Sequence, residues 1–181
     1  ASSAMKMVYL SNVYSGFSFA VGYTPNAGEN GQGTTTGQPV AHSSNTWGSY
    51  SDVLSIHGKY AMEMDGIGLE LVYGNQSGNA GQVAGTNYND LDETSYSAKI
   101  TYGNFAADYR KNDSGNSGYA KGVNTGNVEG TSYCGIYTMA NLAVGACNVN
   151  SSQVDASNFT NDATTRTYSA EYQLGGGVAL G

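Results

Sequence analysis

Apolar residues alternate with small or charged residues along almost every ordered-looking stretch of this chain. In residues 66–74 the odd positions are apolar, whereas the even positions hold glycines, Glu70 and Val72. Residues 17–23 and 96–102 repeat the alternation. Successive side chains of a strand point to opposite faces, while a helix buries residues three to four apart. The pattern therefore predicts strands with one apolar, aromatic face and one face of small or charged residues.

Composition agrees with an all-β chain and excludes two classes of protein. Among 181 residues, 26 are Gly and 15 are Tyr, a mixture that favours strands and turns over long helices. Lys plus Arg is 7 against 14 for Asp plus Glu, so no basic surface for nucleic acid is expected. No stretch approaches the roughly eighteen consecutive apolar residues of a membrane-spanning helix. Any membrane-bound form of this chain must therefore cross with strands.

Short turns and long polar segments alternate along the chain. Two-residue turns are predicted at Asp65-Gly66, Gly103-Asn104 and Ala140-Asn141, and three-residue turns at Tyr14-Ser15-Gly16 and Gly175-Gly176-Gly177. Long segments rich in Gly, Asn, Ser and Thr cover residues 25–51, 75–93, 112–130 and 150–165. Five hairpins, hence about ten strands, are expected, with all short turns at one end of the sheet.

Strand length and aromatic placement favour a membrane barrel over a soluble sandwich. The predicted strands have eight to twelve residues, enough to cross a bilayer at a tilt of about 45°. Aromatic residues flank the short turns and recur near the loop ends of the strands, as in the two interfacial belts of outer-membrane barrels. They are Tyr14, Phe17, Tyr102 and Phe105 at the turns, and Tyr23, Tyr73, Tyr96, Tyr109, Tyr133 and Tyr168 near the loops. The sequence predicts an all-β, transmembrane, antiparallel up-and-down β-barrel, with the soluble sandwich as the alternative.

Ionisable side chains on the predicted strands share the face opposite the apolar one. These candidate pore-lining residues are His57, Lys59, Glu63, Glu70, Lys99, Asp108, Arg110 and Glu171. A central Lys or Arg facing lipid would cost about 2–4 kcal/mol, so the charges are expected to point inward, with Tyr60, Met62, Met64, Ile67, Leu69 and Leu71 facing lipid. They would line water, pair with one another, or do both. Counting outward from Gly103-Asn104 places Lys99 opposite Asp108 and predicts an ion pair there, with Arg110 as a separate cation nearer the loops.

The two cysteines fall opposite each other when residues are counted outward from the Ala140-Asn141 turn. Cys134 then faces Cys147 on the neighbouring strand, on the side away from lipid. Opposed Cβ atoms lie about 4.5–5.5 Å apart, close enough for a disulfide with modest distortion. The sequence leaves two interpretations open: the two cysteines form a disulfide, or they are two small residues that fill the wall.

Signs of enzyme chemistry or metal binding are weak. Ser55 and His57 share a strand face, which makes a hydrolytic pair conceivable, but no orienting carboxylate or oxyanion element accompanies them. Asp90, Asp92 and Glu93 are a weak Ca²⁺ candidate without EF-hand spacing, and a solvated loop explains them better. The chain is expected to be no enzyme and to need no cofactor. The functional alternatives are a hydrolase of the outer membrane and a soluble or surface-exposed β-protein with a structural or adhesive role.

The chain resembles the Gram-negative general porins, the alphaproteobacterial type in particular. The matching stretches are residues 6–10 leading into 16–26, and residues 168–174 followed by 177–180. The resemblance implies an outer-membrane channel for passive diffusion of small hydrophilic solutes and ions, assembled as a homotrimer in the lipid bilayer. It further implies that residues 1–181 form one porin-like segment, corresponding to strands six to fifteen of a sixteen-stranded barrel. A complete ten-stranded barrel is the alternative.

Overall fold

The computed structural model describes residues 6–26, 41–42, 45–46, 50–83, 85–123, 126–154, 159–175 and 178–180. Strands are the only regular elements in these residues. They are β1 (Met7–Leu10), β2 (Phe17–Asn26), β3 (Ala41–His42), β4 (Asn45–Thr46), β5 (Tyr50–Met64), β6 (Ile67–Ala80), β7 (Gln82–Val83), β8 (Thr86–Asn87), β9 (Leu91–Tyr102), β10 (Phe105–Gly115), β11 (Gly126–Met139), β12 (Leu142–Val154), β13 (Thr160–Gly175) and β14 (Val178–Leu180). No helix in this part of the chain is long and apolar enough to span a membrane.

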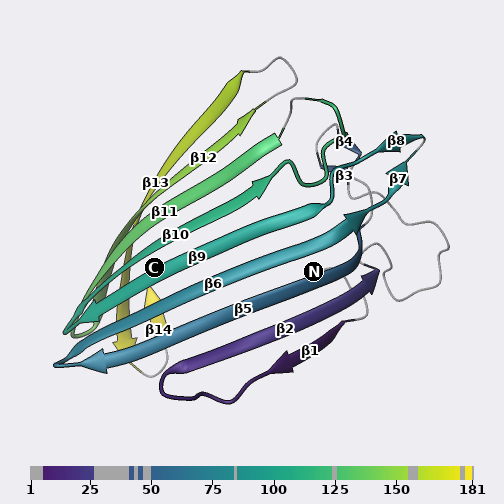
Figure 1. The fold of residues 1–181 in the computed structure, drawn as a ribbon. Coiled ribbons are helices and arrows are strands. Elements are labelled where there is room, and N and C mark those ends of the chain that lie inside the picture. Colours follow the sequence, from purple (N-terminus) through teal and green to yellow (C-terminus); the bar gives the residue numbers. More distant parts are fainter. Residues whose placement is uncertain are drawn as a thin grey trace.

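Ten of these strands form one antiparallel sheet in chain order, and β3–β4 and β7–β8 form two small ribbons. Each strand of the large sheet pairs with the next one along the chain, which confirms the predicted up-and-down connectivity. Figure 1 shows a curved sheet with the short turns after β5, β9 and β11 gathered at one end. Within the described residues the sheet is open, because β1 and β14 each pair with one neighbour.

The short turns follow the predicted positions with one correction. Asp65 and Gly66 both have positive φ, 51° and 76°, as the Asp-Gly signal requires. Ser15 and Gly16 behave likewise, and Tyr14 pairs with Phe17, so this turn has two residues where the sequence predicted three. The backbone of Tyr14 exchanges two hydrogen bonds with that of Phe17, which leaves only Ser15 and Gly16 to reverse the chain. Gly175 also pairs with Val178, while Gly176 and Gly177 lie outside the described residues.

The central strands are longer than predicted. β5 has 15 residues and β13 has 16, against an expected eight to twelve. The additional residues lie at the loop end, where strands continue into Ser-, Asn- and Thr-rich sequence such as 150–154 in β12. Both faces are polar there, so the hydrophobic alternation stops although the backbone ladder continues. The hydrophobic alternation therefore predicted only the part of each strand that has one apolar and one polar face, and it missed the loop-end residues.

The sheet has almost no interior of its own. Val53 and Tyr119 are the only buried apolar side chains among the described residues. Large apolar side chains are instead exposed on the face that carries Tyr60, Met64, Ile67 and Ile100. In water such a face would need a second layer, and the described residues form none. The soluble sandwich therefore finds no support in this fold.

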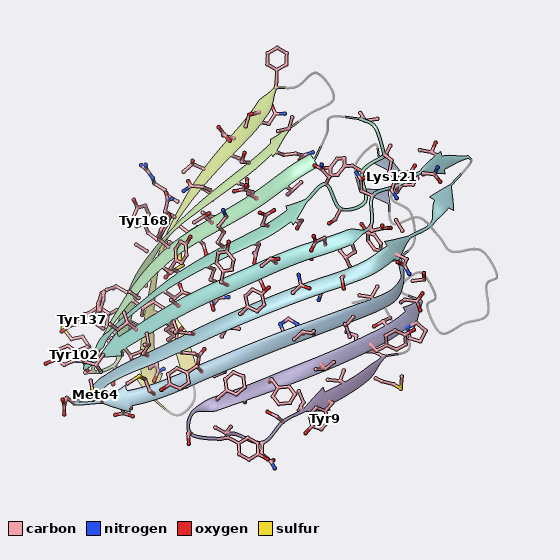
Figure 2. The ribbon with its side chains drawn as sticks, in the orientation of Figure 1. Tyr9, Met64, Tyr102, Lys121, Tyr137 and Tyr168 are labelled. Carbon is pink, nitrogen blue, oxygen red and sulfur yellow. A yellow bond between two sulfur atoms is a disulfide. The ribbon has the colours of Figure 1, made fainter. Side chains whose placement is uncertain are left out.

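The exposed face has the predicted aromatic belts. At the turn end Tyr102 pairs with Phe105, which pairs with Tyr137. Nearer the loops Tyr109 pairs with Tyr133, with ring centroids 5.2 Å apart. Figure 2 shows Met64, Tyr102 and Tyr137 at the turn end and Lys121 at the loop end. An apolar band thus lies between two aromatic rows, as expected at the two interfaces of a bilayer.

Charges return to this face directly beyond the loop-side belt. Lys111 follows Tyr109 on the same face of β10, and its ammonium lies 3.1 Å from the Glu129 carboxylate. Arg166 likewise stands two residues from Tyr168 and donates to the Asn148 amide oxygen at 3.4 Å. These groups mark the height at which the outer face changes from apolar to polar.

Candidate functional site

The second face of the sheet gathers the ionisable residues singled out from the sequence. Nζ of Lys59 lies 2.5 Å from Oε2 of Glu70 on this face. Tyr60 and Leu71, which are directly opposed in the ladder, lie on the other face. The predicted separation of charged and apolar faces is therefore confirmed between the aromatic belts. Two hollows of about 410 and 420 Å³ also open on the charged face. Side chains from several strands converge there, as on the inside of a curved wall.

One row of the ladder crosses the middle of this face. Glu70 is directly opposite Lys99, and Lys99 is directly opposite Asp108. The row continues through Cys134 to Cys147. Negative and positive side chains thus alternate along three neighbouring strands before the wall becomes uncharged.

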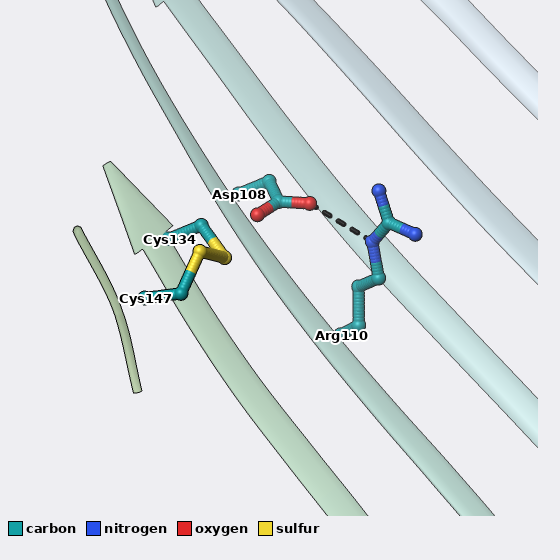
Figure 3. Close-up of a disulfide and its surroundings, with 4 residues drawn as sticks. All are labelled: Asp108, Arg110, Cys134 and Cys147. Atoms are coloured by element: carbon teal, nitrogen blue, oxygen red, sulfur yellow. Dashed lines mark hydrogen bonds and ion pairs between the residues drawn. A yellow bond between two sulfur atoms is a disulfide. The ribbon is translucent and has the colours of Figure 1, made fainter. Parts of the chain in front are cut away.

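The register predicted for Lys99 and Asp108 is confirmed, but the predicted ion pair is wrong. Asp108 instead accepts a hydrogen bond from Nε of Arg110 at 2.9 Å, as Figure 3 shows. Arg110 is therefore not the separate cation that the sequence suggested. Lys59 pairs diagonally across two strands with Glu70, which is directly opposite Ala61. Arg110, in contrast, pairs with Asp108 two residues before it on the same strand.

Among the described residues of this face, Lys99 is the separate cation that the sequence predicted Arg110 to be. The two carboxylates beside it in the ladder, Glu70 and Asp108, pair with Lys59 and Arg110. Among the described residues no carboxylate lies within 4.0 Å of the Lys99 ammonium. Lys99 borders both hollows. It is thus the cation of the central wall whose charge is least compensated by a direct partner.

The remaining candidates lie above and below the central row. Glu63 borders the hollow nearer the short turns. Glu171 of β13 is opposite Ala143 of β12, also toward the turns. His57 lies nearer the loops, opposite Gly74, and a Cβ at position 74 would come within 2.7 Å of its Nδ1. The missing side chain of Gly74 gives the imidazole its place on the wall.

The Ser55 and His57 positions give no sign of a hydrolytic site. Both residues lie on one strand face, as the sequence indicated, with Ser55 opposite Gln76 and His57 opposite Gly74. Within the described residues no carboxylate forms an ion pair with the imidazole. The orienting group that a nucleophile and base require is thus lacking in this part of the chain.

Cys134 and Cys147 form a disulfide in the central row. Their Cα atoms are 4.1 Å apart and the residues are directly opposed, as counting from the Ala140-Asn141 turn predicted. Figure 3 shows the bond beside the Asp108–Arg110 pair. The disulfide ties β11 to β12 at mid-height of the sheet.

Removing this disulfide is expected to lower the free energy of unfolding by about 2–3 kcal/mol, because it closes a short loop in the unfolded chain. Urea unfolding of the oxidised protein and of Cys134→Ser/Cys147→Ser measures the difference. As a control that the disulfide is formed, iodoacetamide should alkylate the two cysteines only after reduction. Equal unfolding midpoints for the two proteins would contradict the expectation.

The acidic run at the start of β9 does not form a cation site. Among the described residues no three His, Cys, Asp or Glu side chains lie close enough to hold a metal. Asp92 and Glu93 are consecutive in a strand and so point to opposite faces. Asp90 accepts the backbone N–H of Ala80 at 2.9 Å. The weak Ca²⁺ candidate fails because the strand separates its ligands.

Two groups at the loop end were not found from the sequence. Asp52 has a positive φ of 52° at a bulge and accepts the Tyr23 hydroxyl at 2.6 Å and the Asn79 amide at 3.3 Å. These hydrogen bonds lower the pKa of Asp52. Burial, with Glu93 and Asp90 nearby, raises the pKa of Tyr50 to about 12. No spacing rule links residues from three separate segments, so only the fold could bring them together.

A comparison with models of protein families finds a match over the whole chain. The model of the Gram-negative porin family matches residues 1–181. No curated protein matches the chain significantly.

Proposed function

This chain belongs to the Gram-negative porins, proteins of the outer membrane, and from that membership we propose that it lines a water-filled channel for passive diffusion of small hydrophilic solutes and ions. Porins are a family of channels without catalysis. The apolar face would contact lipid, and the charged face would contact the water of the lumen.

The separation of the two faces is the observation that carries this proposal. Between the aromatic belts, the charged side chains of the described strands all lie on one face. They are Lys59, Glu63, Glu70, Lys99, Asp108, Arg110 and Glu171. Exposing such a charge to lipid at mid-membrane costs about 2–4 kcal/mol, whereas exposing it to water costs nothing comparable. The arrangement supports a wet lumen behind this face.

The mechanism would combine size selection with the field of the wall. Glu70 and Asp108 alternate with Lys59, Lys99 and Arg110 across neighbouring strands. A solute passing along the wall would meet opposite charges a few ångströms apart and keep its hydration through them. No covalent step and no cofactor takes part.

We also propose the assembly that the resemblance implies. The ten-stranded sheet is curved and open within the described residues. It would form strands six to fifteen of a sixteen-stranded barrel of the alphaproteobacterial type, with 1–181 as an internal segment and three such barrels as the functional unit. Sixteen strands would enclose a wide aqueous lumen, since barrel diameter grows with strand number.

Planar-bilayer recording of the complete protein tests the channel. We expect ohmic conductance on insertion, with closure in three equal steps if the unit is a trimer. Uptake of small sugars into protein-containing liposomes, compared with protein-free liposomes, provides an independent readout. A protein that folds in detergent but gives neither conductance nor uptake would contradict the channel, and single-step closure would contradict only the trimer.

A further inference from the structure

The segment between β10 and β11 contains the most closely packed part of the described chain. We call residues 114–121, the last two residues of β10 and the six that follow it, the strap. Ser117 is 4% exposed and Tyr119 is 8% exposed, on a sheet whose wall residues are otherwise largely accessible. Gly115 and Gly118 have positive φ of 47° and 74°, which lets the strap turn back on itself. A surface loop with buried side chains needs a reason for its packing.

Backbone hydrogen bonds hold the strap against the segment that precedes β9. The N–H of Asn89 donates to the Tyr119 carbonyl at 2.8 Å, and the N–H of Lys121 donates to the Asn87 carbonyl at 2.8 Å. Tyr88 and Ala120 form an antiparallel bridge between these contacts. The strap is therefore attached as a short strand to residues 87–89.

Side-chain hydrogen bonds attach it to two strands of the wall. Ser117 Oγ accepts the Asp92 N–H at 2.9 Å and donates to the Asp92 carbonyl at 3.0 Å. At the other side, Nε2 of Gln153 donates to the Tyr119 hydroxyl at 2.7 Å. Asp92 belongs to β9 and Gln153 to β12. The strap thus reaches across the loop ends of β10 and β11.

The position of its partners shows on which side of the wall the strap lies. Gln153 shares a face of β12 with Cys147 and Val149, which belong to the charged side of the sheet. Ser114 donates to the Glu93 carboxylate at 3.3 Å, and Glu93 shares a face of β9 with Lys99. The strap therefore crosses the candidate lumen face at its loop end, where Figure 2 places Lys121.

We propose that the strap is a fixed rim that narrows the loop-end mouth of the channel, and that the buried side chains of Ser117 and Tyr119 hold it in the position that determines the largest solute admitted. The proposal rests on the proposed channel function. It adds to the width of the lumen a second element that selects solutes by size, located in a loop of this chain. Hydrogen bonds to two strands and to residues 87–89 hold the rim in place, so it does not need a ligand or a voltage to close.

Liposome uptake of neutral sugars of increasing length tests the rim in the complete protein. Ser117→Ala/Tyr119→Ala removes both side-chain anchors. We expect a severalfold faster uptake of tri- and tetrasaccharides, with little change for monosaccharides, which pass the rim already. Unchanged uptake of the longer sugars, by a variant that conducts ions normally, would overturn the rim.

A lock across the bridge provides the matched control. Tyr88→Cys/Ala120→Cys joins directly opposed positions, where Cβ atoms lie about 4.5–5.5 Å apart. When this cysteine pair is added to the Ser117→Ala/Tyr119→Ala variant, its oxidation should restore the wild-type exclusion of the longer sugars, and a reductant should abolish that exclusion again. Wild-type protein treated with the same reductant shows how much of the change comes from reducing the native Cys134–Cys147 disulfide. In otherwise wild-type protein, oxidising the lock should change nothing, because the rim is already in place.

If the Ser117→Ala/Tyr119→Ala variant does not fold, the Tyr88→Cys/Ala120→Cys variant still tests the rim. Slower uptake of small sugars after locking the wild-type background would show that the strap normally moves, and would overturn a fixed rim. Absence of all uptake by wild-type protein would overturn the channel and the rim together. Normal wild-type uptake with an unchanged size limit after anchor removal would overturn only the rim.

Discussion

Ala146→Arg should destabilise the folded protein in the membrane by about 2 kcal/mol, or roughly 30-fold in the folding equilibrium constant. Ala146 is exposed on the apolar face of β12, where it pairs with Gly135, midway between Tyr133 and Tyr137 of the two aromatic belts. The proposed orientation places it in the lipid between the two aromatic belts. A guanidinium there loses its water, and the directly opposed residues, Gly135 and Tyr168, offer it no carboxylate. Unfolding of the protein in lipid vesicles by urea measures the loss.

Val149→Arg on the same strand is the matched control. Val149 is 42% exposed, but it lies on the charged face, opposite Ser132 and in the same row as Arg110. The two variants therefore add the same charge to exposed sites of one strand that lie three residues apart and on opposite faces. The Val149→Arg protein should fold within about 0.5 kcal/mol of wild type, as expected for a substitution in contact with water. Equal losses for the two variants would refute the assignment of lipid and water to the two faces.

Much of this architecture follows from local rules, because a hairpin turn determines which residues oppose each other. Counting from Ala140-Asn141 places Cys134 opposite Cys147, and counting from Gly103-Asn104 places Lys99 opposite Asp108. The side-chain period of two then assigns every residue of both strands to a face. Turn chemistry and alternation together predict topology, register and orientation wherever one face is apolar.

The interactions that decide the site do not follow from those rules. Register identifies Lys99 as the residue opposite Asp108, but the observed partner of Asp108 is Arg110, two residues along the same strand. The strap is harder still, because Ser117 and Tyr119 lie in a Gly- and Asn-rich segment without periodicity. Their partners come from β9 and β12, which no turn places beside the strap. Tertiary contacts between loops leave no repeating pattern in a sequence.

Asp108→Asn should move the ion selectivity of the channel toward anions without affecting folding. The Asp108–Arg110 pair lies on the charged face, and the Arg110 side chain is 66% exposed. Such a pair contributes about 0–1 kcal/mol to stability, so the variant should unfold like wild type. It should nevertheless change ion selectivity, because the substitution removes one negative charge and leaves the Arg110 charge uncompensated next to Lys99. At about 8 Å in water one unit charge changes the energy of a passing ion by about 0.5 kcal/mol, or about twofold in local ion concentration.

The reversal potential under a salt gradient measures this shift, and it should move toward the equilibrium potential of the anion. Glu129→Gln is the matched control, because it also removes a carboxylate from an ion pair, here with Lys111 at 3.1 Å, but on the opposite face of the sheet. A charge on the outer side of the wall is separated from the lumen by the sheet and is screened by salt over about 8–10 Å. The control should therefore keep the wild-type potential. Equal shifts in the two variants, or a shift in Glu129→Gln alone, would show that the charged face does not line the conducting path.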